Sequence, residues 1–131
     1  MKITVVSIPV SDQAAALDFY TNKLGFVKKH DIPVGGENRW LTVVSKEDPD
    51  GPELLLEPSP LHFEPAKTFQ AAVYDAGMPW TQFNVDNVEE EHARLTKLGV
   101  EFSMGPTDAG TVKIAILDDT CGNRIQLVEM K

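Results

Sequence analysis

The sequence predicts an α+β fold made of two βαβββ modules. The first observation behind this prediction is an internal repeat over residues 12–26 and 86–100. Each copy begins with an Asp and has a Gly thirteen positions after it. Each copy ends with Lys-Leu-Gly followed by an apolar residue. The second observation is that one strand-like apolar stretch precedes each copy and three follow it. With 131 residues we expect a single domain over residues 1–131.

The first module, residues 1–58, begins with a strand expected over residues 3–10. Asp12 stands at the expected helix N-cap, because its carboxylate can accept hydrogen bonds from the first free amides of the helix. Apolar residues follow at helical spacings of three and four, at Leu17, Tyr20 and Leu24. Gly25 supplies a left-handed C-terminal position. Between turn sequences, three further strands are expected over residues 26–33, 39–45 and 53–57.

The second module, residues 79–131, follows the same order, with Asp86 as its expected N-cap. The apolar face of its helix is formed by Val88, His92 and Leu95. Its strands are expected over residues 80–85, 100–103, 112–117 and 124–129, with a break at Gly105-Pro106. The connector, residues 59–78, is long for a linker. Residues 65–76 favour a short helix that stops at Gly77.

Composition limits the partners that the protein can have. The chain has 12 Lys and Arg against 20 Asp and Glu, a formal net charge of −8. This balance disfavours nucleic acids and anionic membrane surfaces, which both bind cationic patches. The single Cys121 excludes an internal disulfide framework and a cysteine-built zinc site. No apolar run approaches the ~20 residues that span a bilayer, and the first ten residues form no signal-peptide core. We therefore expect a cytoplasmic protein.

Two motifs of the modules match those of a known superfamily. One is Asp-x6-Phe-Tyr-x3-Leu-Gly-Phe at residues 12–26, and the other is Asp-Asp-x2-Gly-Asn-x-Ile-x-Leu at residues 118–127. With these motifs the chain resembles the vicinal oxygen chelate superfamily, which includes glyoxalase I, extradiol dioxygenases, and fosfomycin-resistance and bleomycin-binding proteins. The resemblance implies that the strands curl around a central cup, which holds a divalent metal in many members. It also implies a homodimer.

The resemblance identifies the positions that would hold the metal, one on each of four strands. Val5 and Trp80 stand at the two histidine positions, and neither side chain can coordinate a metal ion. Glu53 and Glu57 are both candidates for the carboxylate position of the first module, since strand alternation puts both on one face. Gln126 stands at the fourth position, and its neutral amide is a weak ligand. We therefore expect no metal or other cofactor. A weak or relocated divalent metal site is the alternative.

The histidines lie outside these positions. His92 is expected to pack on its helix, His30 to lie on the surface, and His62 to be solvated in the connector. Cys121 has acidic neighbours, which disfavour a reactive thiolate.

Strand alternation also predicts the lining of the cup. The residues expected to face it are Val5, Ser7, Pro9, Trp80, Gln82, Asn84, Gln126 and Val128. Such a lining suits a small aromatic or cationic molecule, because indole stacks on rings and cations while amides orient a ligand by hydrogen bonding. Alternatively, Trp80 fills the space of a metal and its histidine. The face of a second aromatic residue, Trp40, is left open by the sequence.

The sequence thus favours a glyoxalase-like or bleomycin-resistance-like protein that binds a small molecule. The expected ligand-binding residues are Trp80, Gln82, Gln126, Val5, Ser7 and Trp40. The first alternative is a lyase, isomerase or dioxygenase with a weak or relocated metal, in which Glu57 or Glu53 is a ligand or the general base. The second alternative is a non-catalytic dimeric module.

Overall fold

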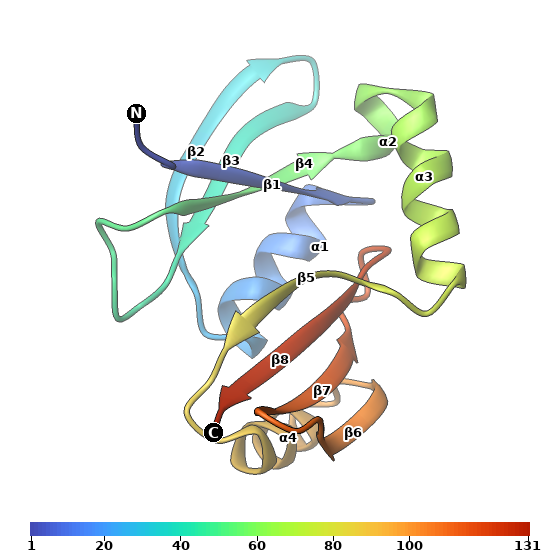
Figure 1. The fold of residues 1–131 in the computed structure, drawn as a ribbon. Helices are drawn as coiled ribbons and strands as arrows, with labels where there is room; N and C mark the ends of the chain where they lie inside the picture. The colour runs from blue at the N-terminus through green and yellow to red at the C-terminus, as the bar shows by residue number, and fades with distance from the viewer. The chain divides into compact units, whose positions relative to one another are not determined.

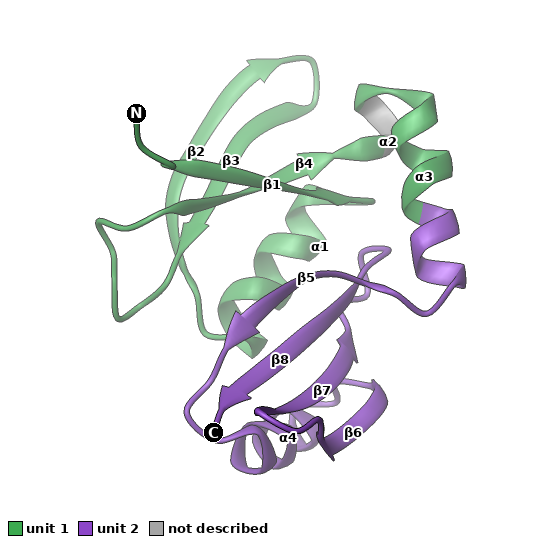
Figure 2. Cartoon of the chain, viewed as in Figure 1, with its two compact units in different colours: residues 1–70 green, residues 71–131 purple. Residues whose placement is uncertain are grey.

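The computed structural model describes residues 1–59 and 62–131. The chain forms two compact units, unit 1 (Met1–Gln70) and unit 2 (Ala71–Lys131), and the boundary between them lies inside helix α3 (Figure 2). Each unit contains one four-stranded mixed sheet, and the sheets are not closed. The predicted α+β fold of two βαβββ modules is therefore confirmed.

The sheet of unit 1 has the strand order β1-β4-β3-β2 (Figure 1). Its strands are β1 (Val5–Val10), β2 (Val27–Gly35), β3 (Asn38–Val44) and β4 (Glu53–Pro58). β1 runs parallel to β4, and the other neighbouring strands are antiparallel. The helical elements are α1 (Gln13–Asp18), a π-helical turn η1 (Phe19–Lys23), α2 (Ser59–His62) and α3 (Glu64–Asp75). The helix predicted in the connector is thus confirmed as α3.

Unit 2 repeats this topology with the strand order β5-β8-β7-β6. Its elements are β5 (Pro79–Asn84), α4 (Val88–Lys97), β6 (Phe102–Asp108), β7 (Val112–Asp118) and β8 (Arg124–Met130). In both units the first strand of the module pairs in parallel with the fourth. The third strand lies next to the fourth in the sheet, and the second strand lies at the edge. The internal sequence repeat therefore corresponds to a repeat in structure. No helix in the described part of the chain is long and apolar enough to cross a membrane.

One face of each sheet packs against the helix of its own unit. In β1 Ile8 and Val10 are fully buried, whereas Val6 is 50% exposed, so the buried apolar row of this strand begins at Ile8. The other fully buried apolar side chains of unit 1 include Ala16, Tyr20, Leu41, Val43 and Leu56. Those of unit 2 include Val88, Leu95, Ala115, Leu117 and Ile125.

The two helices are capped at positions that differ from the sequence repeat by one residue. Asp12 caps α1 as predicted, since its side chain accepts from the amide of Ala15 at 2.9 Å. In unit 2 the cap is Asn87, whose side chain accepts from the amide of Glu90 at 2.9 Å, so the assignment of Asp86 was wrong. Unit 1 therefore has one more residue between its cap and the Lys-Leu-Gly end. The π-helical turn η1 absorbs this residue, because a π turn adds one residue to a helix without displacing its ends.

The predicted strand break at Gly105-Pro106 was also wrong. β6 continues through both residues, and its pairing with β7 shifts register between Met104 and Thr107. A proline is tolerated at this point because β6 is an edge strand, where a missing amide proton removes no required ladder bond.

Candidate functional site

Apart from Trp80, the predicted ligand residues lie on the face of each sheet that points away from its helix, which we call the distal face. Strand pairing defines this face, because residues that are paired across neighbouring strands point to the same side. On the distal face of unit 1 lie Val5, Ser7, Trp40, Glu53 and Glu57. On that of unit 2 lie Gln82 and Gln126. Trp80 is half-buried and stands two residues before Gln82, where the pairing of β5 is irregular.

Two glutamine side chains are joined on the distal face of unit 2. Gln82 and Gln126 stand directly opposite one another on β5 and β8. The Gln126 Nε2 donates a hydrogen bond of 3.1 Å to the Gln82 Oε1. After this bond the pair still has the Gln126 carbonyl as an acceptor and the Gln82 amide as a donor. The pair can therefore bind a carbonyl, hydroxyl or amide group of a ligand.

A second polar group on this face is built around Arg124, two residues before Gln126 on β8. The Arg124 Nε donates to the Tyr74 carbonyl at 3.1 Å, and the guanidinium carbon lies 4.2 Å from the centre of the Tyr74 ring. The Tyr74 hydroxyl donates to the Asp118 Oδ2, and this bond raises the pKa of Tyr74. The candidate list from the sequence lacked Arg124. The sequence did contain a signal for Arg124, because it lies two residues before Gln126 on one strand and alternation puts both side chains on the same face.

The distal face of unit 1 holds a carboxylate with three polar neighbours. The Glu53 Oε1 accepts from the Thr42 hydroxyl at 2.7 Å and lies 2.8 Å from the His30 Nδ1. Lys29 Nζ lies 4.0 Å from the other Glu53 oxygen. The hydrogen bond from Thr42, followed by that from His30, lowers the pKa of Glu53. The side chain of Glu53 is only 15% exposed and that of His30 is 43% exposed. His30 thus lies partly at the surface, as predicted, but its contact with Glu53 was not predicted.

The second candidate carboxylate, Glu57, has a different partner. Its Oε1 lies 3.5 Å from the His62 Nε2, and both side chains are substantially exposed. Glu53 and Glu57 thus belong to two separate His–Glu pairs at opposite ends of β4.

The internal symmetry identifies the residue of unit 1 that corresponds to Gln126. Ser7 and Gln82 each stand five positions before the cap of their helix, and they pair with Leu55 and Gln126 respectively. Leu55 is therefore the counterpart of Gln126, and Glu53 and Glu57 lie two residues to either side of it. On the same alignment Val5 corresponds to Trp80.

The structure also settles the face of Trp40. It pairs with Ile32 on β2 and stands two residues before Thr42, so it lies on the distal face of unit 1. Its side chain is 39% exposed. An indole that is accessible on this face can stack on a planar ligand.

Within residues 1–59 and 62–131, no group of three or more His, Cys, Asp and Glu side chains is placed to hold a metal ion. Each of the two His–Glu pairs of unit 1 brings together only two side chains of the kind that bind metals.

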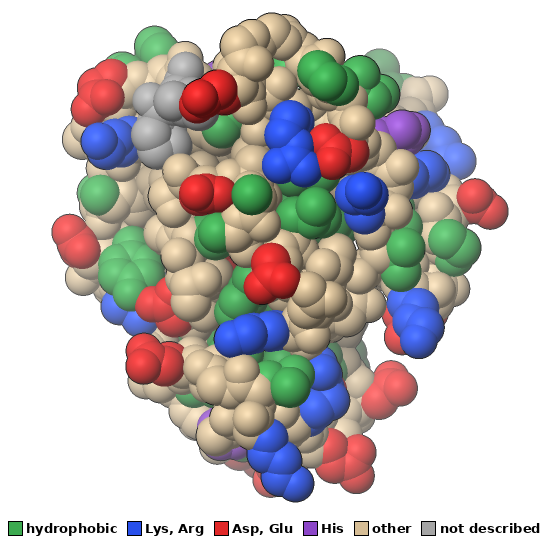
Figure 3. Space-filling model, turned by 180° about the vertical axis from the view of Figure 1, so that it is seen from behind, with side chains coloured by type: hydrophobic (Ala, Val, Ile, Leu, Met, Phe, Trp, Pro, Cys, Tyr) green, Lys and Arg blue, Asp and Glu red, His purple; other side chains and the backbone are tan. Residues whose placement is uncertain are grey.

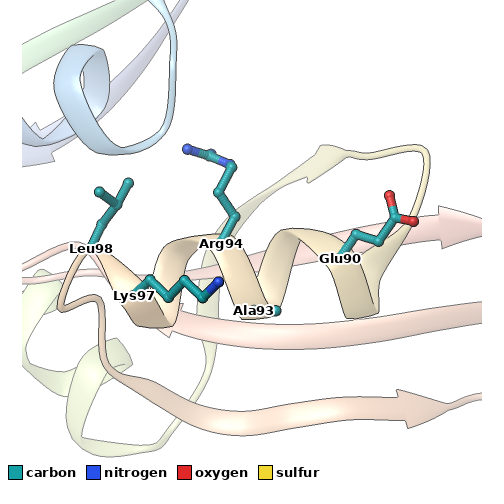
Figure 4. A pocket seen from close by; sticks show the side chains of 5 residues that line it. All are labelled: Glu90, Ala93, Arg94, Lys97 and Leu98. Carbon is teal, nitrogen blue, oxygen red and sulfur yellow. The ribbon is translucent and has the colours of Figure 1, made fainter.

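One further surface feature lies on the helix of unit 2. A shallow depression on unit 2 is lined by five residues of one helical stretch, Glu90, Ala93, Arg94, Lys97 and Leu98 (Figure 4). Arg94 is held there by Glu91, which leaves little to bind a ligand. On the face that Figure 3 displays, acidic and basic side chains are interspersed, and Lys and Arg form no large patch.

Comparison with known proteins identifies relatives of the whole chain. Residues 2–127 match the family model described as the Glyoxalase/Bleomycin resistance protein/Dioxygenase superfamily. YurT, an uncharacterized protein of Bacillus subtilis (strain 168), is 51% identical over 129 residues, which are 98% of this chain and 99% of YurT.

Two solved structures have the same fold. The crystal structure of UcmS2 is 32% identical with a TM-score of 0.82, and the alignment covers 98% of each chain. That of TnmS3, an antibiotic binding protein from Streptomyces sp. CB03234, is 27% identical with a TM-score of 0.73, and the alignment covers 100% of this chain and 97% of TnmS3. The family match, the repeated topology and the two sequence motifs agree: the chain belongs to the Glyoxalase/Bleomycin resistance protein/Dioxygenase superfamily.

Proposed function

We propose that this protein binds a small aromatic molecule without a tightly held metal ion. The observation that carries the proposal is the joined pair of Gln82 and Gln126 on the distal face of unit 2. The resemblance puts a carboxylate ligand at the position of Gln126 and a histidine at that of Trp80. Here these positions hold a neutral amide and an indole, which recognise organic molecules better than metal ions.

The side chains present define how such a ligand is held. The amide pair offers one free acceptor and one free donor group next to one another, which match a ligand carbonyl beside a hydroxyl or amine. Trp80 adds a flat apolar surface on which an aromatic ring stacks. The similarity to TnmS3, an antibiotic binding protein, supports this assignment, since TnmS3 shares the fold over nearly its full length.

The proposal includes the cell compartment and the assembly. We place the protein in the cytoplasm as a homodimer, as the composition and the superfamily resemblance suggest. Light scattering after size-exclusion chromatography tests the assembly, and a mass of one chain over a wide range of concentrations would refute the homodimer.

A thermal-shift screen tests the binding function. Planar compounds with carbonyl, hydroxyl or amine groups should raise the Tm in buffer that contains a chelator, because binding to the folded state stabilises it. Gln126→Ala should abolish the shift. Asn22→Ala is the control, since it removes an exposed amide from η1 of unit 1 and should leave the shift unchanged. The proposal fails if no compound raises the Tm and divalent metals do.

One observation favours a second candidate, an enzyme with a relocated divalent metal. His30 and Glu53 bring an imidazole and a carboxylate within 2.8 Å on one face, and these are two ligand types that a divalent ion uses. Titration with Ni²⁺, Zn²⁺, Mn²⁺ and Fe²⁺ followed by elemental analysis tests this candidate. It requires about one ion per chain, and loss of that ion in Glu53→Gln. Protein that stays metal-free after loading would eliminate it.

A further inference from the structure

Arg124 differs from the two other arginines of the chain in the groups to which its guanidinium donates hydrogen bonds. Arg39 donates to both oxygens of Asp31, at 2.9 and 2.7 Å, and Arg94 likewise engages both oxygens of Glu91. Arg124 pairs with no carboxylate among the residues that the structure describes. It is nevertheless half-buried, where an uncompensated charge is less well solvated than at the surface. A half-buried guanidinium without a carboxylate is a group that an anion would stabilise.

The side chain is held in one orientation by contacts that leave its terminal nitrogens free. Its Nε donates to the Tyr74 carbonyl, and its guanidinium carbon lies over the Tyr74 ring. The hydrogen bonds of the described residues involve neither Nη1 nor Nη2 of Arg124. Two terminal nitrogens of a fixed guanidinium can donate in parallel to the two oxygens of a carboxylate.

The carboxylate nearest along the sheet is already engaged. Asp118 stands opposite Arg124 in the pairing of β7 with β8. Its Oδ2 accepts from the Tyr74 hydroxyl and its Oδ1 accepts from the Thr120 amide at 2.7 Å. Asp118 is therefore directed toward Tyr74 and the loop, and it does not close a salt bridge with Arg124.

We propose that Arg124 binds an acidic group of the ligand, so that the ligand is a planar aromatic acid. This inference rests on the proposed function and specifies its ligand class. Arg124 and Gln126 are two residues apart on one strand face, which separates them by roughly 7 Å. That span suits an aromatic ring system with a carboxylate at one end and a hydroxyl or carbonyl group at the other. The acidic composition favours cationic ligands, whereas this local charge selects the opposite sign.

Three probes that differ only in charge test the inference. They are 6-hydroxy-2-naphthoate, the neutral 6-hydroxy-2-naphthamide and the corresponding naphthylmethylammonium, titrated into the full-length protein by calorimetry. The naphthoate should bind at least about tenfold more tightly than the other two, because hydrogen bonds between charged groups contribute more than neutral ones.

Variants of Arg124 separate its charge from its shape. Arg124→Gln should weaken naphthoate binding about tenfold or more and leave naphthamide binding unchanged, which also shows that the site is still folded. Arg124→Lys keeps the charge without the planar fork and should give an intermediate loss. Arg94→Gln is the matched control and should change neither affinity, because Arg94 pairs with Glu91 on α4.

Each outcome decides between the two proposals. Preference for the naphthoate that depends on Arg124 supports both. Binding of the neutral or cationic probe as tightly as the naphthoate overturns the inference and leaves the proposed function standing. The inference also fails if Arg124→Gln and Arg124→Lys bind the naphthoate as the wild type does. If none of the three probes binds, the inference is overturned for this ligand class, and the thermal-shift screen alone decides the proposed function.

Discussion

The hydrogen bond between Thr42 and Glu53 should contribute more to stability while Glu53 is ionised than after Glu53 is protonated. Thr42→Val replaces the fully buried hydroxyl by a methyl group of similar size. It removes the 2.7 Å bond to the Glu53 carboxylate and leaves the amide of His30, which donates to the same hydroxyl at 3.1 Å, without its acceptor. A bond to a charged group contributes about 1.5–3 kcal/mol and a neutral one about 1 kcal/mol. We expect a total loss of about 2–4 kcal/mol at pH 7.

A double-mutant cycle isolates the part of this loss that belongs to Glu53. Urea unfolding of the wild type, Thr42→Val, Glu53→Gln and the double variant should give a coupling of about 1–2 kcal/mol at pH 7. The folded-state pKa of Glu53 lies below its ordinary value of 4.5. The part of the coupling that depends on the carboxylate charge is therefore fully present above pH 4.5, and it is lost as the pH falls through the folded-state pKa. Thr42→Ser, which keeps the hydroxyl, is the control and should retain most of the coupling.

Two results would refute this reasoning. A coupling below about 0.3 kcal/mol at pH 7 would mean that Thr42 and Glu53 do not interact in solution. A coupling of the same size at pH 7 and at a pH where Glu53 is protonated would mean that the carboxylate charge has no part in it.

Three further predictions follow from other parts of the structure. Asn87→Ala should cost about 1 kcal/mol in urea unfolding while Asp86→Ala costs almost nothing, because Asn87 caps α4; equal losses would contradict the assignment. Of the two tyrosines, Tyr74 should ionise above the ordinary value of 10.0, and Tyr74→Phe should remove that transition from an ultraviolet titration; a lower transition lost in this variant would contradict the bond to Asp118. Deletion of Asn22 should shorten η1 to an α-helical turn and cost less than about 1 kcal/mol. Deletion of Glu90 should turn the rest of α4 by about 100° and cost several times more, and the reverse order would refute the role given to the π turn.

The fold could be predicted from the sequence because several independent signals favour the same helices. The Asp12 cap, the helical spacing of Leu17 and Tyr20, and the Gly25 stop each favour the same helix, and the second copy repeats the pattern. The error at Gly105-Pro106 has a physical origin. A Gly-Pro pair ends most strands, but an edge strand can pass through it at an irregularity.

The polar group at Glu53 could not be predicted in the same way. In β2 the pairing shifts between Lys28 and His30, so that Lys28 pairs with Val43 and His30 with Thr42. Because of this shift, Lys28 and His30 point to opposite faces of the sheet, although they are two residues apart. Strict alternation would have put His30 on the helix side, away from Glu53, and nothing in the local composition marks the extra residue.

The equivalence of Val5 with Trp80 depends on a similar one-residue difference. Alignment of the two copies on their shared Lys-Leu-Gly ends pairs Val5 with Pro79, whereas alignment on the helix caps pairs it with Trp80. The caps give the better alignment for the strands, because each cap lies between its strand and its helix and the extra residue lies beyond it, in η1. Residues before the cap therefore keep equivalent places in both sheets, and Ser7 and Leu55 correspond to Gln82 and Gln126. The apolar Leu55 in unit 1 and the amide in unit 2 make the two distal faces chemically unequal, which is why the proposed ligand contacts lie in unit 2.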